Sequence, residues 1–149
     1  IKKGFDAVII MDGDGQHLVA DIGNFIEKME ATGADMVIGN RMLDVSLMPE
    51  ERKHTNRFMS FLISALSGQR IPDSQSGYRL IKREVLEKIN LRSSNFEIES
   101  EMIIRSSRAG FKIESVPIKT VYDDEKSKVN PVIDTLRFIA FVIKIIFTR

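Results

Sequence analysis

Two aspartates stand two positions apart, directly after a short apolar run near the start of the sequence. Asp12 and Asp14 follow the run in the stretch VIIMDGDGQH. Carboxylates at this spacing in a tight turn can share a hard divalent cation, Mg²⁺ or Mn²⁺, that keeps open positions for phosphate oxygens. Gln16 and His17 could add a ligand or support one. From the spacing alone, metal-assisted binding of a phosphorylated molecule and a merely structural turn rich in Asp and Gly are equally open interpretations.

A calcium loop of the EF-hand type is excluded by the same stretch. His17 occupies the position where that loop needs glycine, and Gly23 occupies the position of its final glutamate. A strand rather than a helix also precedes the loop.

The elements around the aspartates predict a βαβ unit. Residues 6–11 (DAVIIM) form an apolar run that is typical of a strand covered on both faces. Apolar residues then recur at helical spacing over 19–31, with Gly33 as the stop, and residues 35–39 (DMVIG) form a second short strand. This order predicts a parallel sheet with a right-handed crossover, and it places the aspartates at a carboxyl end, where such sheets bind ligands.

The rest of the chain continues in the same α/β style. Over 51–67 we expect a helix with Phe58, Phe61, Leu62, Ala65 and Leu66 on one face and Arg57, Ser60 and Ser64 on the other, ended by Gly68. A turn-rich stretch, a helix, a strand, a polar loop and a last helix are expected at 72–78, 94–109, 112–122, 123–130 and 131–147. Ser94 and Glu97 would form the capping box of the helix at 94–109.

Composition limits the classes of function. The chain has 149 residues, a formal net charge of +1 and no cysteine. This length suits one domain with a sizeable core. Near-neutral charge gives no general case for nucleic-acid binding, and the lack of cysteine excludes disulfides and thiolate metal sites. It also suits a cytoplasmic location.

Six motifs in order resemble family 2 glycosyltransferases with the GT-A fold, in the branch of dolichyl-phosphate mannose synthase and its polyprenyl-phosphate relatives. They are MDGDGQH at 11–17, IGNR at 38–41, DSQSGYRLIKREVLEKI at 73–89, Glu97 to Glu101, ESVPI at 114–118 and KSK at 126–128. The resemblance implies an α/β fold, the C-terminal portion of a GT-A domain with a mainly parallel sheet, over residues 1–130. The nucleotide-binding first half is expected before Ile1, so these residues alone should be inactive.

The resemblance also implies roles for individual residues. Asp12 and Asp14, with Gln16, would hold the Mg²⁺ or Mn²⁺ that bridges the diphosphate of a nucleotide-sugar donor. Arg41, Arg57 and the Lys126/Lys128 loop would contact phosphate groups of the acceptor or donor. Asp73 would either act as a general base, position the sugar or cap its turn. Glu97, Glu99 and Glu101 are assigned instead to solvation, capping and pairing on their helix.

The last helix, 131–149, is expected to be amphipathic. Asp134, Arg137 and Lys144 form a narrow polar stripe, and the apolar run is shorter than the ~20 residues of a membrane span. It would pack into the core or, as the favoured alternative, lie in the membrane interface. The expected protein is therefore a cytoplasmic enzyme, peripherally bound to the membrane.

Three hypotheses of function follow. Two are enzymes that differ in the acceptor of the sugar, and one has no catalytic activity. The first is inverting, metal-dependent transfer of a sugar from a nucleotide-sugar to a polyprenyl phosphate, in cell-envelope or glycan biosynthesis. The second keeps the donor but uses a hydroxyl acceptor on a glycan or lipid, with Asp73 as base. The third is a non-catalytic fragment that binds only metal or membrane.

Overall fold

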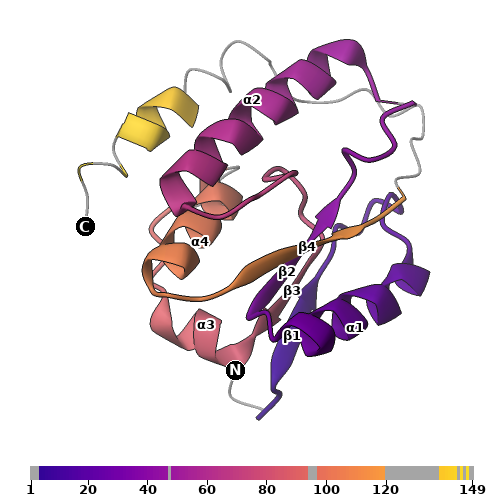
Figure 1. The fold of residues 1–149 in the computed structure, drawn as a ribbon, viewed down its shortest axis with the longest axis vertical. Coiled ribbons are helices and arrows are strands. Elements are labelled where there is room, and N and C mark those ends of the chain that lie inside the picture. Colours follow the sequence, from indigo (N-terminus) through magenta and orange to yellow (C-terminus); the bar gives the residue numbers. More distant parts are fainter. Residues whose placement is uncertain are drawn as a thin grey trace.

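A four-stranded sheet with helices on both faces forms the framework of the protein (Figure 1). The structure, a computed structural model, describes residues 4–46, 48–93, 97–119, 138–143, 145 and 147. In chain order the elements are β1 (Ala7–Ile10), the 3-10 helix η1 (Val19–Asp21), α1 (Ile22–Thr32), β2 (Met36–Asn40), α2 (Glu50–Ser67), β3 (Arg79–Lys82), α3 (Arg83–Lys88), α4 (Glu97–Arg108) and β4 (Ile113–Pro117). The predicted α/β class is confirmed.

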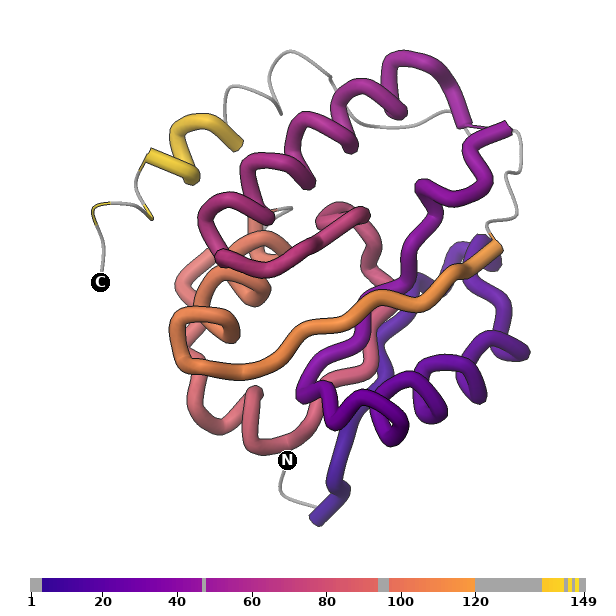
Figure 2. Tube along the Cα trace, viewed as in Figure 1, coloured from indigo at the N-terminus to yellow at the C-terminus, as the bar shows by residue number. Residues whose placement is uncertain are grey.

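The sheet is mixed, which corrects the prediction of a mainly parallel one. Its strand order is β1-β3-β2-β4, and β3 runs antiparallel to both β1 and β2. Within the described part of the chain only β2 and β4 are parallel neighbours, and Figure 2 shows β4 in orange alongside β2. The reason lies after α2, where the chain returns to the carboxyl edge of β2 before it enters the sheet. A strand that begins at that edge must run against its neighbours.

The two faces of the sheet carry separate hydrophobic clusters. On one face α1 packs Phe25 and Met29 against Val37, Leu80 and other residues of the sheet. On the opposite face α2 and α4 pack over the other side chains of the same strands, including Met36, Ile38 and Ile81. Burial on both faces fixes the register of β2 and β3, because a slip by one residue would exchange the two sets of side chains.

β1 is covered on one face only, contrary to the prediction. Ala7 and Ile9 pack against the cluster beneath α1, whereas Val8 and Ile10 keep 36% and 39% of their surface exposed. β1 pairs with β3 alone among the described strands, and the helices of the other face pack on β2, β3 and β4. The apolar run was therefore a correct signal for a strand but not for coverage of both faces.

Helix ends agree with the predictions, and the predicted core face of α2 is correct in part, because Leu62 and Leu66 pack against the core cluster. Gly33 and Gly68 end α1 and α2 in the left-handed conformation, both at φ 67°. In α2 the buried residues are Met59, Ser60 and Ile63. Phe58 and Phe61, expected on the core face, are 50% and 69% exposed. Ser60 faces the core because its hydroxyl accepts a hydrogen bond from the Ser74 backbone N–H at 2.9 Å.

Part of the predicted last helix lies within the described residues. Residues 138–143 are helical, and Phe138, Phe141 and Ile145 are buried in the cluster beneath α2 and α4. Ile139, Ile143 and Phe147 are exposed. The amphipathic helix as a whole, with Asp134, Arg137 and Lys144, lies outside the described residues, as do Ser94 of the capping box and the loop with Lys126 and Lys128. Among the described helices none is long and apolar enough to cross a membrane.

Candidate active site

Three chain segments meet at one edge of the sheet. The turn that carries Asp12 and Asp14, called here the acidic turn, follows the carboxyl end of β1, and Arg41 follows that of β2. β3 begins at this edge, where Arg79 pairs with Ile10 on one side and with Ile38 on the other. The backbone N–H of Gly39 donates to the carbonyl of Tyr78 at 2.9 Å. The antiparallel β3 therefore brings residues 73–78 between the ends of two strands that precede it by many residues.

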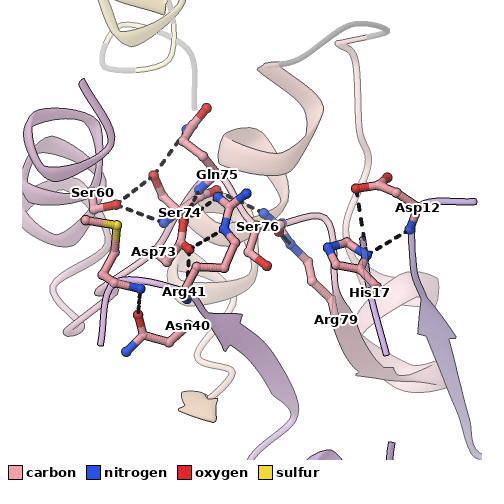
Figure 3. Close-up of polar contacts among 11 residues, drawn as sticks. Asp12, His17, Asn40, Arg41, Ser60, Asp73, Ser74, Gln75, Ser76 and Arg79 are labelled. Atoms are coloured by element: carbon pink, nitrogen blue, oxygen red, sulfur yellow. Dashed lines mark hydrogen bonds and ion pairs between the residues drawn. The ribbon is translucent and has the colours of Figure 1, made fainter. Parts of the chain in front are cut away.

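Arg41 and Asp73 form a bidentate ion pair at this edge (Figure 3). The Nε and Nη2 atoms of Arg41 donate to the two carboxylate oxygens of Asp73 at 2.7 and 2.9 Å. The backbone N–H of Arg41 and of Gln75 donate to the same oxygens at 3.1 and 3.3 Å. The Asp73 side chain is fully buried, and that of Arg41 is 18% exposed. Both oxygens of Asp73 are thus occupied by donors.

A buried arginine fixes the loop that carries Asp73. Arg79 donates from Nε to the carbonyl of Ser76, from Nη2 to that of Ser74 and from Nη1 to that of Glu99, at 2.8, 3.0 and 2.8 Å. Burial lowers the pKa of Arg79, and the neighbouring carboxylates of Glu99 and Asp73 oppose that shift. Because these three bonds end on main-chain carbonyls, Arg79 ties the loop to the start of α4 and holds its backbone in place. Figure 3 shows Arg79 and Ser76 between the Arg41–Asp73 pair and Asp12.

The acidic turn is held from within and from Tyr78. The backbone N–H of Asp12 donates to Nδ1 of His17 at 3.0 Å, and the His17 ring stacks on the Tyr78 ring at 4.8 Å between centroids. The Tyr78 hydroxyl donates to the carbonyl of Leu18 at 2.9 Å. Burial lowers the pKa of His17, against the opposing effect of Asp12. A neutral His17 whose Nδ1 accepts a hydrogen bond supports the turn and does not offer that nitrogen to a metal.

Two of the three predicted metal ligands, Asp12 and Asp14, are open to solvent, and Gln16 is half-buried. The Asp12 side chain is 59% exposed, and Asp14 is exposed as well. Oδ1 of Asp14 accepts the backbone N–H of Gln16 at 3.0 Å, which closes the turn. On its covered side the Asp12 carboxylate lies against Gly77, where a side chain would collide with it.

These residues suit a divalent cation whose coordination is completed by oxygen atoms of a substrate. Among the described residues no group of three or more His, Asp or Glu side chains could enclose an ion. Mg²⁺ is commonly held by one or two carboxylates together with substrate phosphates and water. Asp12 and Asp14 supply two exposed hard oxygen donors of that kind on one turn, and Gln16 lies beside them. The donor set thus suits Mg²⁺ or Mn²⁺ shared with a phosphate ligand.

Two glutamates of α4, Glu99 and Glu101, make contacts beyond the solvation, capping and pairing that were predicted for them. Glu101 pairs with Arg105 at 2.6 Å, as expected, and its Oε2 also accepts the backbone N–H groups of Arg92 and Ser93. Glu99 differs, because burial raises its pKa, against the opposing effect of Arg79. Asp12 and Asp73 also act electrostatically on Glu99. The carbonyl of Glu99 also accepts a hydrogen bond from Arg79, which links this residue to the edge of the sheet. Only the alternation E-I-E-S-E at the start of a helix could have suggested this.

The other residues predicted to contact phosphate, Arg57, Lys126 and Lys128, are not seen beside Arg41 and Asp73 in the described part of the chain. Arg57 is exposed on α2, one helical turn before Ser60, and it makes no hydrogen bond or ion pair within the described part of the chain. Lys126 and Lys128 lie outside that part. The structure joins Asp12, Arg41 and Asp73 at one edge, and the roles assigned to them stay predictions.

Comparison with known proteins gives a consistent result. Residues 5–90 match the model of a family described as glycosyl transferase family 2. The chain is 36% identical over 122 residues to an uncharacterized protein of Methanocaldococcus jannaschii, a match that covers 78% of this chain and 50% of that protein. It is 32% identical over 128 residues to the UDP-N-acetylglucosamine–dolichyl-phosphate N-acetylglucosaminyltransferase of Methanococcus voltae, covering 83% and 51%.

A third relative is the polyprenol monophosphomannose synthase of Mycolicibacterium smegmatis. The identity is 32% over 128 residues, which cover 79% of this chain and 46% of the synthase. The chain thus spans about half the length of the curated relatives it matches.

Proposed function

The chain belongs to glycosyl transferase family 2, and from this premise we propose that the complete protein transfers a sugar from a nucleotide-sugar to a polyprenyl phosphate. The names of two relatives include the words dolichyl-phosphate and polyprenol monophosphomannose, which supports this class of acceptor. The proposed reaction is an inverting displacement at the anomeric carbon.

The observation that carries the choice of acceptor is the Arg41–Asp73 pair. A hydroxyl acceptor must lose a proton as it attacks, so it needs a general base. A phosphate monoester has a second pKa of about 6 and is already ionised near pH 7, so it needs none. Because both oxygens of Asp73 accept hydrogen bonds from Arg41, this buried carboxylate is poorly placed to take a proton from a substrate. The geometry favours the acceptor that requires no base.

Asp73 then acts through Arg41. A guanidinium has five N–H donors in a rigid fork and can bond more than one anion at a time. Asp73 aligns that fork at the carboxyl end of β2. We assign Arg41 to the phosphate of the acceptor, where a charge-assisted bond is about twice as strong as a neutral one.

Asp12, Asp14 and Gln16 are proposed to hold Mg²⁺ or Mn²⁺ together with the diphosphate of the donor. The cation would offset the charge that develops on the departing nucleoside diphosphate. The backbone N–H of Asp12 and the ring of His17 keep the turn in place for this purpose.

The membrane surface is the proposed location of the acceptor, at the cytoplasmic face. Phe58 and Phe61 are exposed on α2 beside Arg57, and Ile139 and Ile143 are exposed in the last described helical segment. Exposed aromatic and aliphatic side chains with a cation among them suit the interface of an anionic bilayer. Arg57 and the Lys126/Lys128 loop would add positive charge for the lipid phosphate.

Steady-state kinetics of the complete protein with a short-chain polyprenyl phosphate test the acceptor. Arg41→Lys keeps the charge but loses the fork, so kcat/KM for the acceptor should fall about 10- to 150-fold, from a bond worth about 1.5–3 kcal/mol. Asp73→Asn should cost less and leave the shape of the pH profile unchanged. Arg83→Lys, at an exposed pair with Glu87, is the matched control and should match the wild type.

The opposite pattern would identify a hydroxyl acceptor. In that case Asp73→Asn would nearly stop turnover and remove the acidic limb of the rate profile, while Arg41→Lys would remain close to normal. Circular dichroism of each variant separates these outcomes from loss of folding.

A further inference from the structure

Gly77 lies directly under the carboxylate of Asp12. A Cβ atom built on Gly77 would lie 2.8 Å from Oδ2, 3.1 Å from Oδ1 and 3.3 Å from Cγ of Asp12. Ordinary contacts of a Cβ atom lie at 3.4–4 Å. Gly77 has no positive φ, so its backbone conformation is open to any residue, and only the space is restrictive. The Asp12 carboxylate occupies the volume that a side chain at position 77 would fill.

The two sides of this contact differ in their freedom to move. The loop of Gly77 is fixed by Arg79, whose donors end on the carbonyls of Ser74, Ser76 and Glu99. The backbone of Asp12 is fixed by its bond to His17. The Asp12 side chain, in contrast, is 59% exposed and can rotate toward solvent. A methyl group at position 77 would therefore move the carboxylate and leave the fold in place.

We propose that Gly77 is a positioning residue of the metal site: the space left by its missing side chain sets where the Asp12 carboxylate can stand. The inference rests on the proposed function, in which Asp12 is a metal ligand. Relief of the contact requires a shift of about half an ångström, and ligand distances in metal sites vary by only about 0.2 Å. The loop that contributes Asp73 to the acceptor side thereby also sets the geometry of the donor side.

Binding of Mn²⁺ to the protein, followed by the electron paramagnetic resonance signal of the free ion, tests the proposal without turnover. Titrations are made with Mn²⁺ alone and with Mn²⁺ plus inorganic pyrophosphate as a stand-in for the donor diphosphate. Gly77→Ala and Gly77→Ser should weaken Mn²⁺ binding about 10- to 100-fold, the usual loss when a support of a metal ligand is removed. The melting temperature of the metal-free protein should stay within a few degrees of the wild type.

Two comparisons make the test specific. Gly23→Ala is the matched control, because a Cβ at Gly23 meets nothing within 4 Å, and it should bind Mn²⁺ like the wild type. In an Asp12→Asn background, Gly77→Ala should cause no further loss, since the residue acts only through that carboxylate.

The outcomes separate the inference from the function on which it rests. Wild-type protein that binds no Mn²⁺ under either condition would overturn the metal assignment and this inference with it. Wild-type protein that binds Mn²⁺ while a folded Gly77→Ala variant binds it equally well would overturn the role of Gly77 alone. A large drop in melting temperature for Gly77→Ala, or an additive loss in the double variant, would show that Gly77 serves the fold and not the carboxylate.

Discussion

Removal of the Arg41 side chain should destabilise the fold as well as the site. In Arg41→Ala the buried carboxylate of Asp73 loses the bonds of 2.7 and 2.9 Å and keeps only the backbone N–H groups of residue 41 and Gln75. Removing one partner of a buried ion pair typically costs about 3–5 kcal/mol. Since the Arg41 side chain is 18% exposed and water can enter its place, we expect the lower end, about 3 kcal/mol.

Urea unfolding followed by circular dichroism measures this effect. A loss of about 3 kcal/mol should also lower the melting temperature by roughly 6–12 °C for a chain of this size. Asp73→Asn should cost less, because the guanidinium that it leaves behind can reach solvent. Arg41→Ala/Asp73→Asn should be more stable than Arg41→Ala alone, since the double variant no longer buries an unpaired charge.

Two results would refute this account. If Arg41→Ala cost less than about 1 kcal/mol, the carboxylate would have to be solvated in a way that its burial does not allow. If the costs of the single variants simply added, the two side chains would not be coupled. Arg83→Ala, which removes an exposed pair with Glu87, is the control and should change the free energy of unfolding by at most about 0.5 kcal/mol.

Two further predictions concern the metal and the acid limit of stability. Asp14→Asn should reduce turnover of the complete protein about 10²- to 10³-fold, more than Asp12→Asn, and chelator should stop the wild type; turnover that persists in chelator would contradict the metal assignment. Glu101→Gln should cost about 2 kcal/mol in urea unfolding at pH 7. Burial raises the pKa of Glu101, but the N–H of Ser93, Arg105 and the N–H of Arg92 outweigh it and hold that pKa below its ordinary value. The stabilisation is therefore present above the unfolded pKa of about 4.3 and is lost as the pH falls through the folded value, so an equal cost at pH 3 and pH 7 would be contrary evidence.

Local signals predicted the first half of the fold well. The apolar run of β1, the helical spacing over α1 and the glycines after α1 and α2 are features of neighbouring residues, and the structure places these elements within one to three residues of the prediction. β3 and α3 were not predicted. RLIK has only four residues between a turn and a helix, and its place between β1 and β2 depends on long-range pairing that a local pattern does not encode.

The site was predicted in its parts but not in its contacts. The sequence indicated Asp12, Arg41 and Asp73 as candidates, and all three lie at the same edge of the sheet. That Asp73 is held by Arg41, and that Gly77 supports Asp12, could not be predicted, because both facts follow from the antiparallel entry of β3. The core face of α2 was predicted in part: Leu62 and Leu66 pack against the core, whereas Phe58 and Phe61 are exposed. Hydrophobicity alone could not show which apolar residues of this helix face the sheet.

The position of β3 also determines how the protein can fold. Among the described strands β1 pairs with β3 alone, so Ala7 must find Lys82 far along the chain, and β2 gains its antiparallel neighbour in the same step. Non-local pairing of this kind raises the contact order and slows folding, because the entropy of closing a long loop is lost before contacts compensate for it. During synthesis the pairs of β3 with β1 and with β2 can therefore form only after residues 79–82 have emerged. Since the loop before β3 supplies both Asp73 and Gly77, the site is assembled when β3 enters between β1 and β2, before β4 joins β2. A chain in which β3 is unpaired therefore has no assembled site.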